Sequence, residues 1–205
     1  MTQKRPGESD PEDAEWPARP LFLPDIGLPI GDGLYVHSIA YNKPAGTLVA
    51  TLQPVGLSPP ADQRIFLRTL GEARYREVTL PHDLASVTGV AVCTDAPVVF
   101  LNLMKWTSAD RQGANDLGLY RVSLPVGLVE KLPEPNDPVT APQSISIVSV
   151  LAASADATEL HVVVSVPAFV RVPPHHGYAM GFFLATYAVP SGTIHIFDEA
   201  LAAFG

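Results

Sequence analysis

Short apolar runs alternate with turn-forming clusters along most of the chain, from about residue 30 to residue 197. The runs are rich in Val, Ile, Leu, Phe, Tyr and Thr, and the clusters between them hold Pro, Gly, Asp and Asn. This alternation is typical of strands joined by turns. The helical period of about 3.6 residues does not persist, and the 21 prolines of the chain disfavour long helices. The pattern predicts an all-β domain over 30–197.

The predicted strands fall into three sets of four with the same internal order of connections. A polar turn follows the first strand of each set, a long loop follows the second and a short turn follows the third. The second strands are the most apolar, which suits strands covered on both faces. The fourth strands carry charge, as at Arg76-Glu77 and Glu130-Lys131, which suits a sheet edge. The predicted strands are 35–41, 47–52, 64–69 and 75–80, then 87–92, 98–105, 118–123 and 127–132, then 144–151, 160–166, 182–189 and 193–197.

The third set carries a family resemblance. Its sequence, SISIVSVLAASADATELHVVVSV followed by GFFLATYAVPSGTIHIF, resembles the blades of TolB-like and WD40-like β-propellers. Ser154-Ala155-Asp156-Ala157 stands at the turn where those blades carry a Ser-x-Asp-Gly sequence, with Ala157 in place of the glycine. The resemblance covers about 35–197 and implies a propeller-like array of about three four-stranded blades. The residue pattern also leaves a β-sandwich or a barrel open.

Three blades cannot close a ring, because propellers have about four to eight. An open array would leave the faces of its end blades uncovered, and repeat arrays need caps to be soluble. If the blades are present, the resemblance therefore implies either a homodimer that joins two arrays about a twofold axis or a partner that completes the ring.

Composition narrows the classes of partner. The chain is 47% hydrophobic, and 13 basic residues against 21 acidic ones give a net charge of −8. This balance argues against nucleic acid and favours a protein partner with a basic surface. The single cysteine, Cys93, excludes a disulfide framework and reads as a small buried residue. No apolar run reaches the length of a membrane span, and 1–20 lacks the apolar core of a signal peptide, so we expect a cytoplasmic protein.

The two ends of the chain differ from the middle. Residues 1–20 hold four prolines, five carboxylates and one large apolar residue, Trp16, which predicts a flexible acidic arm. Residues 198–205 predict a short C-terminal helix or tail, with Asp198 as its cap and Leu201 and Phe204 on one side.

The candidate functional residues lie in the long loops and the connectors between sets. In a four-stranded blade, the loop after the second strand and the connector to the next blade open on the same face. That face would gather polar side chains from several blades, and it is where we expect a partner or ligand to bind. The candidates are His82, Asp83, Trp106, Asp110, Arg111, Asn115, Asp116, His175, His176 and Tyr178.

His175-His176 with Tyr178 is the cluster most typical of a site, because histidine serves as a metal ligand and as a near-neutral acid or base. Adjacent histidines on an extended chain point to opposite sides, and no carboxylate lies within ten residues of the pair. The spacing of Asp110, Asn115 and Asp116 does not match an EF-hand. We therefore predict no metal and no cofactor.

The leading hypothesis is a non-enzymatic protein-interaction module. Trp106 and Arg111 are residue types that dominate protein interfaces. The sequence has no nucleophile elbow, phosphate loop, zinc-protease motif or dinucleotide fingerprint. Two alternatives stay open. One is a ligand-binding or enzymatic propeller, such as a lyase, hydrolase or sugar binder, that uses His82, His175 and His176. The other is an acidic inhibitor or immunity-type protein.

Overall fold

The computed structural model describes residues 28, 33–54, 63–82, 85–107, 114–136, 145–172 and 175–197, with backbone only for Trp106, Ala114, 167–172 and 175–180. The predicted acidic arm and C-terminal helix lie outside these residues. The strands are β1 (Leu34–Asn42), β2 (Thr47–Pro54), β3 (Arg64–Thr69), β4 (Arg76–Glu77), β5 (Ala85–Val92), β6 (Val98–Trp106), β7 (Ala114–Ser123), β8 (Leu128–Lys131), β9 (Ser146–Ala153), β10 (Glu159–Val172), β11 (His175–Ala188) and β12 (Ile194–Ile196).

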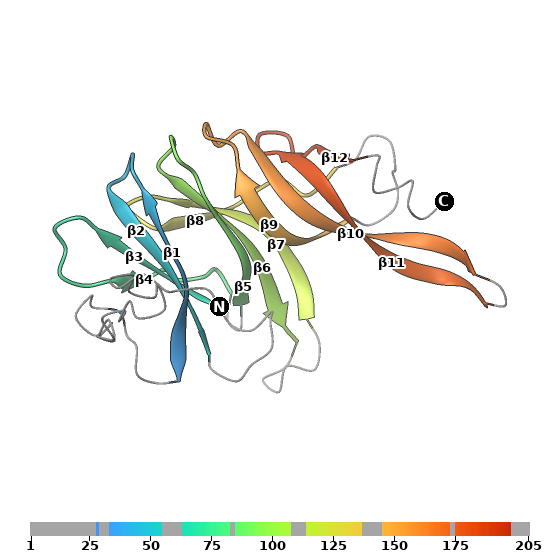
Figure 1. Ribbon diagram of the computed structural model, residues 1–205, viewed down its shortest axis with the longest axis horizontal. Coiled ribbons are helices and arrows are strands. Elements are labelled where there is room, and N and C mark those ends of the chain that lie inside the picture. The colour runs from blue at the N-terminus through green and yellow to red at the C-terminus, as the bar shows by residue number, and fades with distance from the viewer. Residues whose placement is uncertain are drawn as a thin grey trace, which may run out of the picture.

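The strands form three separate four-stranded antiparallel sheets in chain order (Figure 1). Sheet 1 is β1-β2-β3-β4, sheet 2 is β5-β6-β7-β8 and sheet 3 is β9-β10-β11-β12. The predicted all-β class and the three sets of four strands are confirmed, and no sheet closes on itself. Among the described residues no helix is long and apolar enough to span a membrane.

Sheet 2 lies between the other two sheets and is buried on both faces. Along β6, Val99, Leu101 and Leu103 pack in one apolar cluster with residues of sheet 1. Phe100, which points to the opposite side, packs in a second cluster with residues of sheet 3. All four side chains are fully buried. The central position of sheet 2 therefore explains why β6 carries apolar residues on both of its faces. This is the pattern that predicted a strand covered on both faces.

Two buried asparagines join the sheets. Asn42, at the end of β1, donates from Nδ2 to the carbonyl oxygens of Cys93 (2.9 Å) and Ala96 (2.8 Å) in sheet 2. Asn102, in β6, donates from Nδ2 to the carbonyl oxygens of Ile147 and Val148 in sheet 3, each at 3.1 Å. The sheets are therefore held together by specific polar contacts as well as by apolar packing.

Two predicted connections differ from the structure. The loop expected over 167–181 is wrong, because β10 and β11 continue their pairing to Val172 and His175 as a long hairpin. The connector after β8 was expected to stay at the end of the long loops. Instead it crosses to the outer edge of sheet 3, where Asn136 forms a parallel bridge with Thr193. Tyr187 fixes this crossing by donating from its hydroxyl to the carbonyl oxygen of Pro133 at 2.7 Å.

Candidate functional site

The connector between sheets 1 and 2 and the segment that follows β6 lie at one end of sheet 2. Ala85, at the start of β5, pairs with Lys105, and the next residue of β6, Trp106, pairs with Ala114. Gln63, before β3, forms an isolated bridge with Val87. In Figure 1 this end lies opposite the β1–β2 and β5–β6 turns. The strand pairing thus brings one connector and one long loop to the same end, as the blade pattern predicted.

The predicted site residues do not form one cluster. His82 is exposed on the connector between sheets 1 and 2, and Asn115 and Asp116 are exposed in β7. Trp106 is the last residue of β6. His175, His176 and Tyr178 lie in β11, paired with Val172, Arg171 and Phe169, in a hairpin that extends from sheet 3. Asp83, Asp110 and Arg111 lie outside the described residues.

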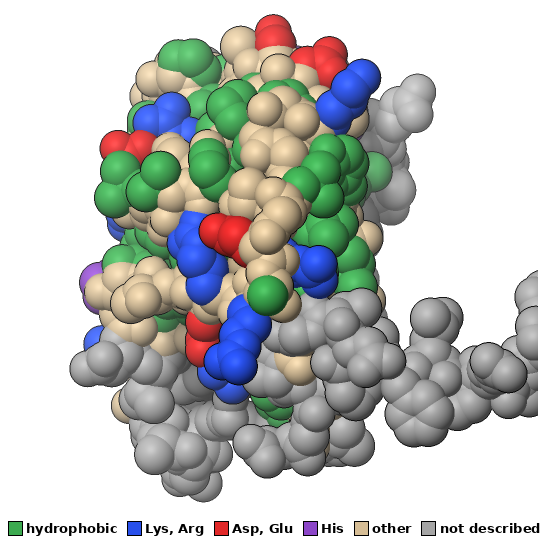
Figure 2. Space-filling view, turned by 90° about the vertical axis from the view of Figure 1, so that its left-hand side faces the viewer, with side chains coloured by type: hydrophobic (Ala, Val, Ile, Leu, Met, Phe, Trp, Pro, Cys, Tyr) green, Lys and Arg blue, Asp and Glu red, His purple; other side chains and the backbone are tan. Residues whose placement is uncertain are grey.

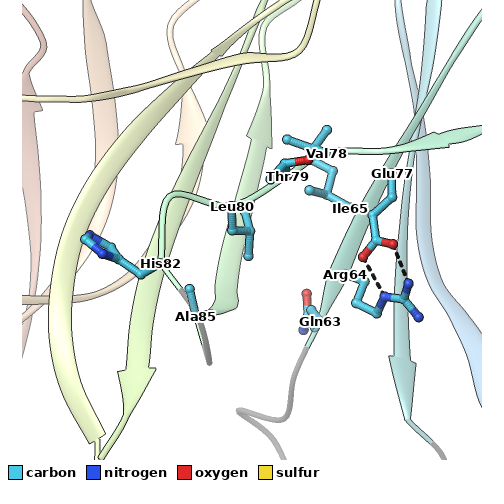
Figure 3. A pocket seen from close by; sticks show the side chains of 9 residues that line it. All are labelled: Gln63, Arg64, Ile65, Glu77, Val78, Thr79, Leu80, His82 and Ala85. Atoms are coloured by element: carbon cyan, nitrogen blue, oxygen red, sulfur yellow. Dashed lines mark hydrogen bonds and ion pairs between the residues drawn. The ribbon is translucent and has the colours of Figure 1, made fainter.

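A cavity of about 340 Å³ opens beside His82, at the junction of sheets 1 and 2 (Figure 3). Arg64 and Glu77 form an ion pair on one side, with Arg64 Nε donating to Glu77 Oε1 at 2.6 Å. Figure 3 shows the imidazole of His82 pointing away from this pair. The lining residues are Gln63, Arg64, Ile65, Glu77, Val78, Thr79, Leu80, His82 and Ala85.

The two charged side chains that line this cavity, Arg64 and Glu77, are paired with each other. The hydrogen bond to Glu77 raises the pKa of Arg64, against the opposing effect of burial, and Glu77's charge adds to the rise. The Arg64 guanidinium also lies over the ring of Phe66, at 5.3 Å from its centroid. Apart from this pair, the polar side chains of the lining are Gln63, Thr79 and His82. This set can accept a small, partly polar group, and it shows no nucleophile held against a base.

Asp116 is bound to the backbone around it. Its Oδ1 accepts a hydrogen bond from the amide nitrogen of Gly118 at 2.8 Å. Partial burial of the carboxylate raises the pKa of Asp116, and the backbone N–H groups of Gly118 and Ile147 oppose that rise. These contacts give Asp116 a structural role at the start of β7. Within the described part of the chain, no group of three or more His, Cys, Asp or Glu residues is placed to hold a metal ion.

Cys93 has the environment that the sequence predicted. It is buried, and burial together with the negative charge of Asp156 raises the pKa of its thiol to about 11. The thiol is therefore protonated at neutral pH, and a protonated thiol is a poor nucleophile.

The β10–β11 hairpin is the feature that sequence reasoning missed. β9 pairs with β10 only as far as Ser165, whereas β10 and β11 remain paired from Val166↔Gly181 to Val172↔His175. These seven pairs correspond to roughly 23 Å of ribbon at about 3.3 Å per residue. In Figure 1 the ribbon projects away from sheet 3. This ribbon was not predicted because Pro167 is a residue type that usually ends a strand. The polar–apolar alternation of Val170, Arg171 and Val172 did indicate a strand.

The chain has little similarity to known proteins. No protein-family model matches it, and none of the curated proteins does. Among solved structures, TolB from Acinetobacter baumannii is similar over 80% of this chain, with 15% sequence identity and a TM-score of 0.41. The similarity covers 32% of the TolB chain, so this protein spans about a third of that structure's length. It agrees with the weak resemblance to TolB-like proteins found in the sequence.

Proposed function

We propose that this protein is a non-enzymatic interaction module, a propeller-like array of three blades that presents the β10–β11 hairpin to a protein partner. The observation that supports this proposal is the ribbon itself. Seven residue pairs extend beyond the last contact with β9, and β12 pairs only with residues 185–187 of β11. Both edges of the ribbon are therefore open among the described residues.

An open ribbon of this kind gains stability by binding. A two-stranded hairpin alone is at best marginally stable in water. Each open edge also offers unpaired N–H and C=O groups, which a strand of another protein can satisfy by β-augmentation. The hairpin sequence adds apolar and aromatic residues, including Phe169, Tyr178 and Met180. Such side chains give an added strand its specificity.

Charge favours a particular kind of partner at the hairpin. From Leu160 to Phe197 the sequence contains no Asp or Glu, although the whole chain carries a net charge of −8. The same stretch holds Arg171 and four of the six histidines. A neutral or acidic protein surface is therefore the partner that this segment would attract. A basic partner, which the overall composition favours, would instead bind the rest of the chain, where all the Asp and Glu residues lie.

The test is site-specific photo-crosslinking in the cells of origin. A benzophenone side chain replaces Tyr178 in the hairpin, and in a control protein it replaces Tyr41, an exposed tyrosine of β1. We expect a covalent adduct with a distinct protein at position 178 and none at position 41. Equal adducts at both positions, or no adduct with another protein at position 178, would contradict the proposal.

A second variant separates binding from folding. Residues 167–180 are replaced by Asn-Gly, which closes Val166 and Gly181 with a two-residue turn. Because these residues lie beyond the contacts of β9, we expect an unchanged melting temperature and loss of the captured partner. A shortened protein that still captures the same partner would show that the hairpin is not the binding element.

A further inference from the structure

The two ends of the three-sheet array are not equivalent. The outer face of sheet 1, which points away from sheet 2, is covered in its middle, whereas Ile39 and Tyr41 of β1 are 46% and 48% exposed on it. Ala50, Leu52 and Phe66 are buried there, and Leu28 from the segment before β1 packs against them. Figure 2 shows the side of the molecule that sheet 1 forms, where Lys and Arg side chains lie close to Asp and Glu. This end therefore has a small core of its own and a surface on which paired charges lie beside apolar side chains.

Among the described residues, the outer face of sheet 3 carries large apolar side chains that remain exposed. Along β11, Phe183, Ala185 and Tyr187 are buried against sheet 2, so the alternate residues Phe182 and Leu184 point to the other side. Phe182 is 62% exposed and Leu184 is 51% exposed. Apolar side chains that are exposed next to each other, unlike single scattered ones, mark an interaction surface.

The neighbouring strands extend this face. Val163 in β10 is paired with Leu184, so the two side chains share a side of the sheet. Past β12, the amide nitrogen of Phe197 donates to the carbonyl oxygen of Leu184 at 3.1 Å, and the ring of Phe197 is 39% exposed. Phe197 also makes an edge contact with His195, with ring centroids 6.5 Å apart. We name Val163, Phe182, Leu184 and Phe197 the outer patch.

Charge indicates which partner covers the outer patch. Two copies of a chain with a net charge of −8 repel each other over most of their surfaces. The outer patch lies within 160–197, the stretch of the sequence without Asp or Glu. The nearest described carboxylate in the sequence, Glu159, lies 3.7 Å from the Nε2 of His161. This face is therefore where a second copy can approach with the least repulsion.

We propose that the protein forms a homodimer in which the outer patches of two copies pack face to face about a twofold axis. A twofold axis places the same surface on both sides of the interface, and an apolar sheet face satisfies that requirement without charge pairing. The contact repeats the apolar sheet-on-sheet packing between sheets 2 and 3 of one chain, with sheets about 10 Å apart. The ring closure expected from the sequence would instead also need the outer face of sheet 1, where Leu28 already packs on Ala50, Leu52 and Phe66.

Sedimentation equilibrium on the full chain tests the dimer. We expect a mass of twice the 21.9 kDa of one chain at micromolar concentration. Leu184→Glu buries a carboxylate in the interface and should weaken association by roughly 100-fold. Leu128→Glu, which changes a residue that is 57% exposed on β8, should leave it unchanged. A wild-type monomer at all concentrations, or a dimer insensitive to Leu184→Glu, would overturn the proposal.

Crosslinking provides a second readout that does not depend on a disruptive variant. Phe182→Cys and Leu184→Cys place a single reactive thiol on the outer patch, because Cys93 is buried. A short bis-maleimide should join two copies through these thiols but not through Leu128→Cys. If the patch thiols become accessible only after removal of 198–205, the chain's own C-terminus covers this face and the dimer proposal fails.

The dimer and the interaction module can fail independently. Replacing residues 167–180 with Asn-Gly leaves Val163, Phe182, Leu184 and Phe197 in place, so the shortened protein should remain a dimer. A shortened protein that becomes monomeric would assign self-association to the hairpin and overturn the role of the outer patch. Loss of partner capture in a shortened protein that stays dimeric supports both proposals.

Discussion

The side-chain amide of Asn42 reaches the main-chain carbonyl of Cys93, 51 residues along the chain, at 2.9 Å. The same nitrogen donates to the carbonyl oxygen of Ala96, and the Asn42 Oδ1 accepts a hydrogen bond from the amide nitrogen of Ala45. Asn42 is completely buried. One side chain therefore closes the turn after β1 and joins sheet 1 to the β5–β6 turn of sheet 2.

Asn42→Ala should lower the free energy of unfolding by about 2–3 kcal/mol, because it removes three hydrogen bonds and takes the side-chain donor from the carbonyl of Cys93, whereas the carbonyl of Ala96 keeps the amide nitrogen of Val98. Urea unfolding followed by far-ultraviolet circular dichroism measures the change. Asn115→Ala, at an exposed asparagine, is the matched control and should change stability by less than about 0.5 kcal/mol. Equal effects of the two substitutions would show that Asn42 does not hold the sheets together.

Gly89 sets the distance between β5 and β9. A Cβ at this position would lie 2.7 Å from Ser149 Oγ, 2.8 Å from the nitrogen of Val150 and 2.9 Å from its oxygen. Gly89→Ala should therefore destabilise the protein by roughly 2 kcal/mol or more, because two of the three contacts are with backbone. Thermal unfolding reports the loss. Adding Ser149→Ala should restore only a minor part of the lost stability. Full restoration would show that the contacts with the backbone of Val150 do not destabilise the protein.

Ala157 has a φ of 64°, in the left-handed region that disfavours side chains. It occupies the turn position where the propeller blades that the sequence resembles carry glycine. Ala157→Gly should raise the free energy of unfolding by about 0.5–1 kcal/mol, since the left-handed conformation costs alanine more than glycine loses in entropy. Ala155→Gly, at an exposed neighbour with an ordinary φ, should lower it slightly. The two variants are compared by urea unfolding, and a loss of stability in Ala157→Gly would contradict the expectation.

Tyr187 should make stability depend on pH in the alkaline range. Burial, followed by the negative charge of Glu134, raises its pKa to about 12. The unfolded value is about 10, so the folded state favours the protonated phenol. The stabilisation is complete below pH 10 and is lost as the pH rises from 10 to 12, by up to about 1.4 kcal/mol per pH unit.

Tyr187→Phe isolates this effect, because every other alkaline group is common to both proteins. The variant should be less stable at pH 8 by about 1 kcal/mol, since it loses the hydrogen bond to Pro133. Its stability should fall less steeply than that of the wild type between pH 10 and 12. Urea unfolding at several pH values measures both slopes, and parallel slopes would mean that Tyr187 titrates at the same pH in the folded and unfolded states.

Part of the candidate site was accessible to sequence reasoning. The connector carrying His82 and the end of β6 at Trp106 share one end of the fold, as predicted, because strand direction alternates regularly in an antiparallel sheet. The ribbon carrying His175 and Tyr178 was not predicted. Pro167 and the Pro173-Pro174 pair are residue types typical of loops. Pro167 is nevertheless part of β10, because a proline, which has no N–H, is tolerated at a strand edge where no partner needs that donor.

The sequence by itself determined where strands and turns lie and how they group. Alternating polarity, β-branched residues and turn-forming clusters act locally, within a few residues, so they can be read without coordinates. Only the tertiary structure decided what each face meets. Asn42 and Asn102 look alike in the sequence, but their partners lie in other sheets. Leu52 and Leu184 are equally apolar, and packing alone buries the first and leaves the second exposed. These outcomes depend on contacts between residues far apart in the chain.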